Sequence, residues 1–140
     1  MREITGELWD FYRKPNTVIC ITTNGFVKNN GEAVMGRGCA AEAKMRIPQF
    51  AALLGYHLKK NGNVPMRVPQ EPILTFPVKH NWWEEADLIL IQKSAEWLAQ
   101  RDPACTYVLP RPGCGNGRLK WADVKQVISF LPDNVWVISR

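Results

Sequence analysis

The sequence has 140 residues, of which 46% are hydrophobic and 22% are charged. This length and composition predict a single globular domain spanning 1–140 and exclude a disordered chain. The 18 lysines and arginines outnumber the 13 acids, which gives a net charge of +5. That charge favours an anionic partner such as a nucleotide or a nucleic acid, although many soluble proteins are equally basic.

Short apolar runs alternate with longer helix-prone stretches along the chain. The β-branched run at 17–23 predicts a buried strand, and Pro48 is expected to break the helix-prone segment 38–60. The remaining expected strands are 72–78, 105–109 and 134–139, and the remaining expected helices are 84–101 and 120–131. This alternation predicts an α/β fold with a mostly parallel sheet covered on both faces.

Several classes of protein are excluded by what the sequence lacks. No run approaches the roughly 18 apolar residues of a membrane helix, and the N-terminal MREITGELWD has acids where a signal peptide is apolar. The four cysteines form no CxxC pair and the two histidines lie far apart, so neither a metal site nor a disulfide framework is expected. We therefore expect a cytoplasmic protein that uses no metal and no cofactor and contacts no membrane.

Two glycine-rich segments each follow an expected strand and precede an expected helix. They are NGFVKNNGEAVMGRG at 24–38 and PRPGCGNGRLKW at 110–121. Glycine lets backbone N–H groups approach phosphate oxygens closely, and a helix start adds further N–H donors. Neither segment matches a P-loop or a GxGxxG motif in its proper setting. The pair predicts phosphate binding at the carboxyl edge of the sheet, outside the kinase and classical dehydrogenase families.

The order of the motifs ITGEL, TTNG, VMGRG and PRPGCGNGRLKW resembles the macrodomain family over nearly the whole chain. The segment FPVKHNWW and the GCG-type loop look most like one branch of it. That branch holds the terminal ADP-ribose protein glycohydrolase and the DNA ADP-ribosyl glycohydrolase antitoxin. The resemblance implies a three-layer α/β/α fold with a mixed, mostly parallel sheet, and an ADP-ribose site across the sheet edge.

The resemblance also implies a set of ADP-ribose-binding residues. Glu7 matches the acid that binds the adenine amino group, although aspartate is commoner there, and Asn24 matches a position facing the distal ribose. The glycines near residue 36 match the loop around the distal ribose and phosphate, and the second loop closes over the diphosphate. The full expected set is Glu7, Leu8, Asn24, Met35, Gly36, Gly38, Gly113, Cys114, Gly115, Asn116 and Gly117.

Lys79, in FPVKHNWW, matches the lysine that acts at the anomeric carbon in this branch. A neutral amine there could attack the carbon, which requires a pKa below about 10.4 through burial or a neighbouring cation such as His80 or Arg111. Alternatively, a charged Lys79 steadies the leaving group or a ribose hydroxyl. From its position alone, Lys79 would be an ordinary surface lysine after a strand.

Gly117 departs from the pattern of the protein-directed enzyme, in which an aspartate occupies that position. The departure argues against glutamate-linked ADP-ribose as the substrate. The DNA-directed relatives also lack that aspartate and keep the lysine, so they resemble this sequence more closely.

Four residues are expected to contact nucleic acid: His80, Trp82, Trp83 and Arg111. The two tryptophans could form a platform for a base, or they could cap the core at the start of the following helix. Arg37, Arg111 and Arg118 flank the glycine loops and could meet phosphates, or Arg118 could instead pair with Asp123. Cys114 lacks a recognisable catalytic partner and is interpreted as a packing residue.

We therefore expect a monomeric ADP-ribosyl glycohydrolase that removes ADP-ribose from a DNA base, ADP-ribosyl-thymidine, with Lys79 at the distal ribose. Its expected partners are ADP-ribose or ADP-ribosylated DNA and a cognate ADP-ribosyltransferase toxin. Two alternatives stay open, a non-catalytic ADP-ribose-binding module and an ADP-ribose 1″-phosphate phosphatase.

Overall fold

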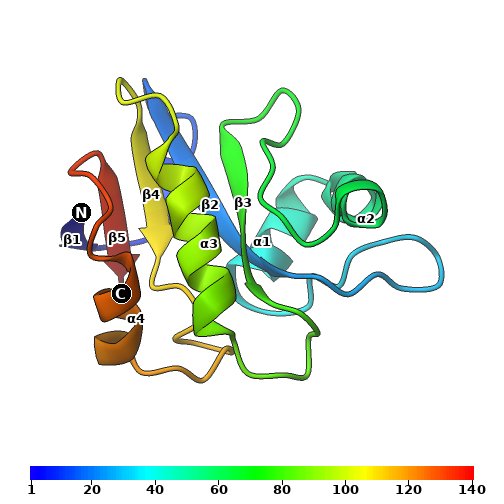
Figure 1. The fold of residues 1–140 in the computed structure, drawn as a ribbon. Coiled ribbons are helices and arrows are strands. Elements are labelled where there is room, and N and C mark those ends of the chain that lie inside the picture. Colours follow the sequence, from blue (N-terminus) through cyan, green and yellow to red (C-terminus); the bar gives the residue numbers. More distant parts are fainter.

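The computed structural model describes residues 1–140, which form five strands, four α-helices and one 3₁₀ turn (Figure 1). In chain order these are β1 (Arg2–Thr5), η1 (Leu8–Phe11), β2 (Thr17–Asn24), α1 (Gly38–Arg46), α2 (Phe50–Asn61), β3 (Ile73–Lys79), α3 (Leu88–Ala99), β4 (Thr106–Pro110), α4 (Trp121–Ile128) and β5 (Val135–Ser139). None of the helices has both the length and the apolar composition that crossing a membrane requires.

The strands form one sheet in the order β1-β5-β4-β2-β3. Every neighbouring pair of strands is parallel, so the α/β prediction is confirmed and the sheet is parallel throughout where the resemblance implied a mixed one. The only antiparallel pairings are two isolated bridges, Val27 with Ala33 and Arg67 with Leu74 of β3.

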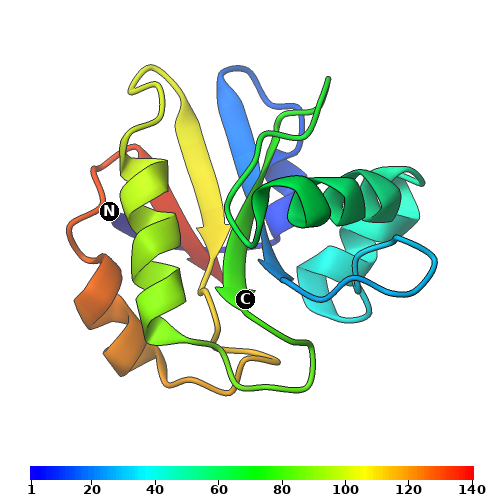
Figure 2. The ribbon, with the colours of Figure 1, turned by 45° about the vertical axis from the view of Figure 1, so that its right-hand side comes forward.

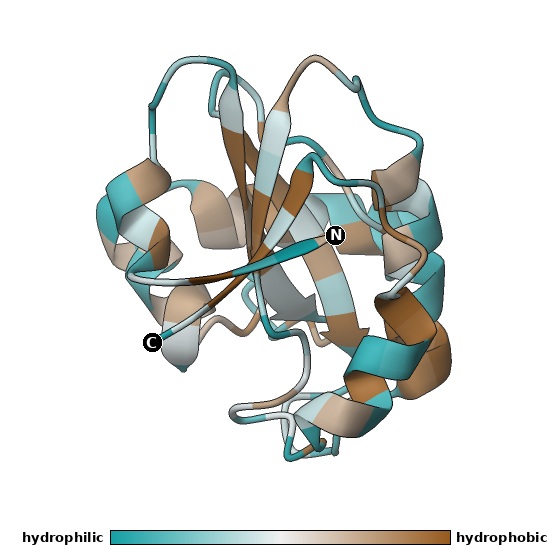
Figure 3. Cartoon of the chain, turned by 90° about the vertical axis from the view of Figure 1, so that its left-hand side faces the viewer, coloured by the Kyte–Doolittle hydropathy of each residue, from teal (hydrophilic) through white to brown (hydrophobic).

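Helices cover both faces of this sheet, with α3 and α4 on one face and α1 and α2 on the other (Figure 2). Strand β2 shows why both faces are apolar. Val18 and Cys20 face the α3–α4 side, whereas Ile19 and Ile21 face the α1–α2 side. In Figure 3 the strands carry hydrophobic segments at the centre of the molecule, while the connecting loops are largely hydrophilic. The result is the expected three-layer arrangement.

Local sequence explains most of the element boundaries. The segment 38–60 breaks at Pro48 into α1 and α2, as expected. Helix α3 begins later than expected because Asp87 caps it, with its Oδ1 accepting a hydrogen bond from the Ile89 N–H at 2.9 Å. Strand β1 was not predicted, since its four residues are mostly exposed and it pairs only with β5 at the sheet edge.

Four of the six tryptophans are half-buried: Trp9, Trp97, Trp121 and Trp136. Cys20 is fully buried, whereas Cys105 is half-buried. The large fully buried side chains are instead aliphatic residues together with Phe50 and Phe76.

The order of the strands reverses at β2, because β3 lies on one side of it and β4 on the other, and this reversal determines where the site lies. The chain leaves β2 through α1 and α2 to β3 on one side, and then crosses back through α3 to β4 on the other side. In an open parallel sheet, the carboxyl ends of the two strands at such a reversal leave a crevice for a ligand. The loops after β2 and β4, which are the two glycine-rich segments, both open at this crevice.

Candidate functional site

A cleft of about 760 Å³ lies at the carboxyl ends of the strands. It is lined by residues that follow all five strands and by the start of α1. Of the expected ADP-ribose set, nine residues line it: Leu8, Asn24, Met35, Gly36, Gly38, Gly113, Gly115, Asn116 and Gly117. Lys79, Trp82, Trp83 and Arg111 also line it, whereas Glu7, Cys114 and His80 do not.

The two glycine loops meet at the cleft. A Cβ added to Gly38 would lie 3.5 Å from the Asn116 Nδ2, so the start of α1 and the second loop are neighbours. At Gly36 and Gly115 an added Cβ would meet nothing within 4 Å. Neither of these glycines is required by the packing of the protein, and each leaves backbone open to the cleft. Such open backbone beside a helix without a side-chain cap, as α1 is, suits an anionic group such as a diphosphate.

Gly113 and Gly117 are glycines for a different reason, because the loop folds on itself. A Cβ on Gly117 would lie 2.4 Å from the Gly113 carbonyl oxygen and 2.8 Å from the Ala86 Cβ. The same loop is held by a hydrogen bond from the Ala86 N–H to the Gly117 carbonyl at 3.0 Å. No side chain fits at residue 117 in this loop, and therefore no carboxylate can stand there.

Lys79 lies at the end of β3 with its ammonium inside the cleft. Its Nζ donates to the Asn116 carbonyl at 3.0 Å and to the Trp82 carbonyl at 3.3 Å. Burial, and after it the charges of Arg118 and Arg37, lowers the pKa of Lys79 below its ordinary value. No carboxylate lies within ion-pair distance of Lys79, Arg37 or Arg118, so all three cations are uncompensated.

The main chain at Lys79 is held from two sides. The Asn63 Nδ2 donates to the Lys79 carbonyl at 2.8 Å, and the Gly25 N–H donates to it at 3.1 Å. Asn24, its partner in the β2–β3 register, lies at a bulge. The Asn24 side chain donates to the Val34 carbonyl at 3.1 Å and accepts from the Phe26 N–H at 3.0 Å, so it shapes the first loop.

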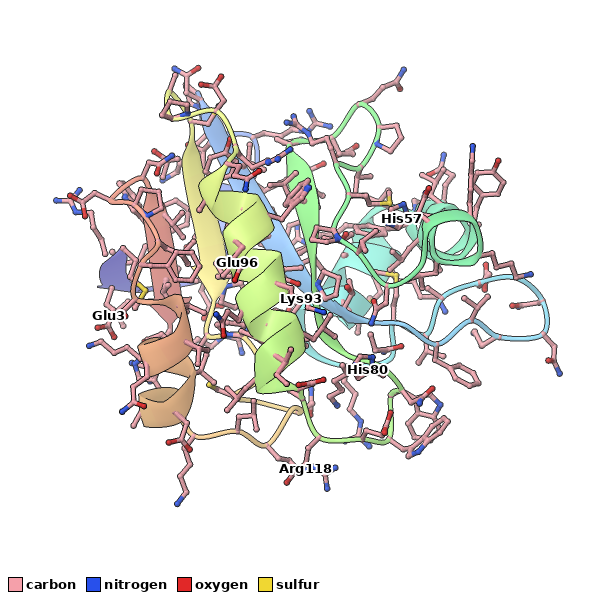
Figure 4. The ribbon with its side chains drawn as sticks, in the orientation of Figure 1. Glu3, His57, His80, Lys93, Glu96 and Arg118 are labelled. Atoms are coloured by element: carbon pink, nitrogen blue, oxygen red, sulfur yellow. The ribbon has the colours of Figure 1, made fainter.

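The prediction that His80 or Arg111 is the cation that lowers the pKa of Lys79 is wrong, because each of them contacts an acid elsewhere. His80 Nε2 lies 2.8 Å from Asp87 Oδ2, and that hydrogen bond is the main cause that lowers the pKa of Asp87. Arg111 stacks on Trp121 at 4.8 Å and lies 3.8 Å from Glu3. Figure 4 shows Arg118 at the lower edge of the molecule, while Glu3, which belongs to β1, lies at the left. The charged neighbours that the sequence did not single out for Lys79 are Arg118 and Arg37.

At the other end of the cleft, beside β1 and β5, the charges are paired. Arg140 Nε lies 3.0 Å from Glu7 Oε2, and its Nη2 lies 3.5 Å from Glu42 Oε1. Glu7 is thus at the margin of the cleft, between the lining residues Gly6 and Leu8, and its carboxylate faces Arg140.

Trp82 and Trp83 do not cap the core, because both are exposed on the rim of the cleft. Arg118 does not pair with Asp123, since its Nη2 donates to the Trp83 carbonyl at 3.3 Å. Cys114 is half-buried, and burial raises the pKa of its thiol, which opposes a role as a nucleophile. No group of three or more metal-binding side chains is present.

Among the cleft residues that the sequence did not single out, two stand out because their polar atoms are buried. These are Trp9 and Thr23, which both line the cleft. Each also has a buried polar atom without a hydrogen-bond partner, the Trp9 Nε1 and the Thr23 Oγ1. The position of Thr23 immediately before Asn24, at the end of an expected strand, could have identified it. Nothing in the sequence distinguishes Trp9 from a core tryptophan.

No protein-family model matches the sequence, and no curated protein is similar enough to match it. Solved structures do match. The macrodomain of Thermus aquaticus DarG has 26% sequence identity and a TM-score of 0.76 over 99% of this chain and 97% of that chain. The macrodomain of Mycobacterium tuberculosis DarG has 26% identity and a TM-score of 0.74 over 98% of this chain and 95% of that chain.

A third structure, Thermosipho africanus DarTG in complex with ADP-ribose, has 18% identity and a TM-score of 0.78. That match covers 98% of this chain but only 41% of the other, so this chain spans less than half of that protein, and at this identity the likeness shows the fold alone. With the two DarG macrodomains, the likeness extends over nearly the full length of both chains. It confirms the resemblance found in the sequence: the chain has the macrodomain fold and is similar to the macrodomains of DarG proteins.

Proposed function

We propose that this macrodomain binds ADP-ribose and hydrolyses the bond that joins it to a DNA base, with Lys79 as the catalytic residue. One observation carries the proposal: a half-buried lysine without a carboxylate partner lines the same cleft as two arginines and two open glycine loops. The DarTG structure that matches this fold contains ADP-ribose, which supports the choice of ligand.

The charges of the cleft favour one orientation of ADP-ribose. Its diphosphate lies against the open backbone at Gly36 and Gly115, where N–H groups and nearby cations favour a negative group. The distal ribose then reaches Lys79, and the adenine lies toward Leu8 and Glu7 beside β1. An uncharged adenine suits that end, because its charges are already paired.

The lowered pKa of Lys79 favours the neutral amine as the reacting form. The amine nitrogen attacks the anomeric carbon, the glycosidic electron pair passes to the base nitrogen, and that nitrogen takes a proton from solvent. Water then attacks the same carbon, which releases ADP-ribose and restores the amine. Burial, Arg118 and Arg37 together lower the pKa of this amine, and the two arginines also attract the negative charge of the ligand.

The loop at Gly117 supports a substrate other than ADP-ribosyl-glutamate. In the protein-directed relatives an aspartate stands at this position, but here a Cβ would lie 2.4 Å from the Gly113 carbonyl oxygen. The cleft therefore works without a carboxylate beside the anomeric carbon, as the DNA-directed relatives do. By the same reasoning we propose a cognate ADP-ribosyltransferase as the partner that makes the substrate.

The test compares release of ADP-ribose from DNA carrying ADP-ribosyl-thymidine and from protein carrying ADP-ribosyl-glutamate. We expect release from DNA only, and a decrease of at least about 100-fold for Lys79→Ala, the size of effect seen when one electrostatic group is removed from an active site. Lys44→Ala, on α1 and outside the cleft lining, is the matched control. No release from either substrate by a protein that still binds ADP-ribose would instead favour a binding module, and release of phosphate from ADP-ribose 1″-phosphate would favour a phosphatase.

A further inference from the structure

We propose that Trp82 and Trp83 form a base-stacking corner, which holds the unpaired base next to the ADP-ribosylated nucleotide of a single-stranded DNA. This inference rests on the proposed function and names the form of its substrate. The corner consists of these two side chains on the rim of the cleft, in the loop between β3 and α3.

About half of each indole surface is exposed and makes no contact within the protein. Trp82 is 51% exposed and Trp83 is 54% exposed, and both line the cleft. The other large exposed hydrophobic side chains are outside the cleft lining: Met45, Tyr56, Val64, Ile89 and Phe130. Two adjacent large aromatic surfaces at a binding cleft indicate a ligand with apolar faces.

The geometry of the rings suits a flat ligand. The two indole rings lie 5.4 Å apart at an angle of 88°, so a planar base can stack on one ring while its edge meets the face of the other. Phe26, from the loop after β2, lies edge-on to Trp83 at 5.5 Å and 69° and fixes the position of that ring.

The corner is held in place before any ligand arrives. Trp82 and Trp83 are the two central residues of a turn, which is closed by a hydrogen bond from the Glu84 N–H to the Asn81 carbonyl at 3.2 Å. The Asn81 Nδ2 also donates to the Glu84 Oε1 at 2.7 Å. A platform ordered in this way loses little conformational entropy when a base stacks on it.

Two cations connect the corner to the reacting centre. The Lys79 Nζ donates to the Trp82 carbonyl at 3.3 Å, and the Arg118 Nη2 donates to the Trp83 carbonyl at 3.3 Å. A base on the corner is therefore next to the nucleotide whose bond Lys79 attacks. The guanidinium of Arg118 keeps further N–H donors for the phosphate that joins the two nucleotides.

This combination of flat aromatic faces and free cations matches a single strand better than a peptide. Every nucleobase has a face that stacks on an aromatic ring, so recognition is independent of base sequence, and the phosphates meet the cations. An acidic peptide would meet the cations but would leave both indole faces exposed. A duplex would keep its bases stacked on one another and out of reach of the corner.

The test measures kcat/KM for ADP-ribose release from two substrates, a single-stranded oligonucleotide with one ADP-ribosyl-thymidine and the ADP-ribosyl-thymidine mononucleotide. The ratio of the two values reports the neighbouring nucleotides, because any effect on ADP-ribose binding cancels, and abasic neighbours then separate the contribution of the bases from that of the phosphates. We expect the oligonucleotide to be favoured by at least about tenfold, within the range of stacking on one aromatic residue. Trp82→Ala, Trp83→Ala and replacement of the neighbouring nucleotides by abasic sites should each remove the part of that advantage that the bases contribute. Combining a tryptophan variant with abasic DNA should remove no more.

The control variant is Tyr56→Ala, which removes a 66% exposed aromatic ring outside the cleft and should keep the full advantage. The proposal would be overturned if the oligonucleotide kept its higher kcat/KM in both tryptophan variants. It would also be overturned if abasic neighbours left that difference intact. If the tryptophan variants lose the same factor in kcat/KM with an ADP-ribosylated acidic peptide, the corner is also overturned, because it would then bind protein substrates.

Failure of the proposed function can be told apart from failure of the corner. If the wild-type protein releases no ADP-ribose from any substrate, binding of an unmodified single-stranded oligonucleotide still decides the question, as quenching of tryptophan fluorescence. The corner predicts quenching that falls in Trp83→Ala and weakens with abasic DNA. Equal affinity for the intact and the abasic strand would overturn it.

Discussion

The two ends of the cleft differ in how their charges are balanced. At the lysine end (Arg37, Lys79 and Arg118), three cations have no carboxylate within ion-pair distance. At the glutamate end (Glu7, Glu42 and Arg140), one cation lies between two carboxylates, at 3.0 Å and 3.5 Å. The same fold thus holds one end whose cation is paired with carboxylates and one end whose cations are uncompensated, around one ligand site.

The difference indicates which part of a ligand each end receives. Uncompensated cations repel one another, and that repulsion contributes to the lowered pKa of Lys79. A bound anion relieves the repulsion, so the lysine end is prepared for phosphate and for charge that develops in a reaction. The glutamate end needs no ion, and it suits a neutral ring system.

The largest effect is expected from reversing charge at the lysine end. The double variant Arg37→Glu with Arg118→Asp should lower the affinity for ADP-ribose by at least about 100-fold, since hydrogen bonds to charged groups are worth about 1.5–3 kcal/mol each. Aspartate is chosen at 118 because Arg118 has a φ of +65°, a conformation that aspartate tolerates. Titration calorimetry measures the change. An affinity within threefold of the wild type would show that these cations do not bind the ligand.

The glycine loops between the two ends should show the next largest effect. Gly36→Ala places its methyl group in open space, so it should lower ADP-ribose affinity by about tenfold without a change in the unfolding midpoint. Gly117→Ala forces a methyl group against the Gly113 carbonyl, so it should also destabilise the fold by about 1–3 kcal/mol. Thermal unfolding and calorimetry separate the two. Destabilisation by Gly36→Ala would mean that its glycine serves the fold and not a ligand.

The pH dependence of the reaction tests the role of the two arginines. A neutral Lys79 makes kcat/KM rise with pH, through a pKa below the ordinary lysine value. Arg118→Asn removes a nearby positive charge, so the pKa of Lys79 should rise. The rising part of the plot of kcat/KM against pH should then move to higher pH. Arg37→Gln should produce a smaller shift in the same direction. A rate that falls as pH rises through this range would assign Lys79 a charged, stabilising role.

The smallest effect is expected at the glutamate end. Glu7→Gln removes one partner of an exposed ion pair, and such pairs contribute about 0–1 kcal/mol, so the affinity for ADP-ribose should change by less than about threefold. A loss comparable to that of the charge-reversed lysine end would show that Glu7 binds the adenine strongly, and the contrast between the two ends would be lost.

Much of the fold could be predicted because strong local patterns encode it. The run TVICITT is buried on both faces of β2, and Pro48 cannot continue the helix that precedes it, because proline lacks the N–H that a helix interior requires. Strand β1 could not be predicted, because its sequence REIT is polar and its strand conformation depends on β5, more than 130 residues further along the chain.

The site was predictable in its loops but not in its charges. Glycines after two strands identified both walls of the cleft, since backbone chemistry follows from sequence position. The partners of Lys79 did not follow from proximity along the chain. His80 is its neighbour in sequence but bonds to Asp87, whereas Arg118 is 39 positions away and reaches it through the folding of the second loop. Similarly, the exposure of Trp82 and Trp83 depends on a turn that the sequence did not reveal.

The most direct test of the two-ended cleft is a crystal structure of the protein with ADP-ribose bound. We expect the diphosphate against the backbone at Gly36 and Gly115, the distal ribose beside the Lys79 Nζ, and the adenine next to Leu8. Adenine at the lysine end, with the distal ribose beside Glu7, would contradict the assignment of Lys79 as the catalytic residue.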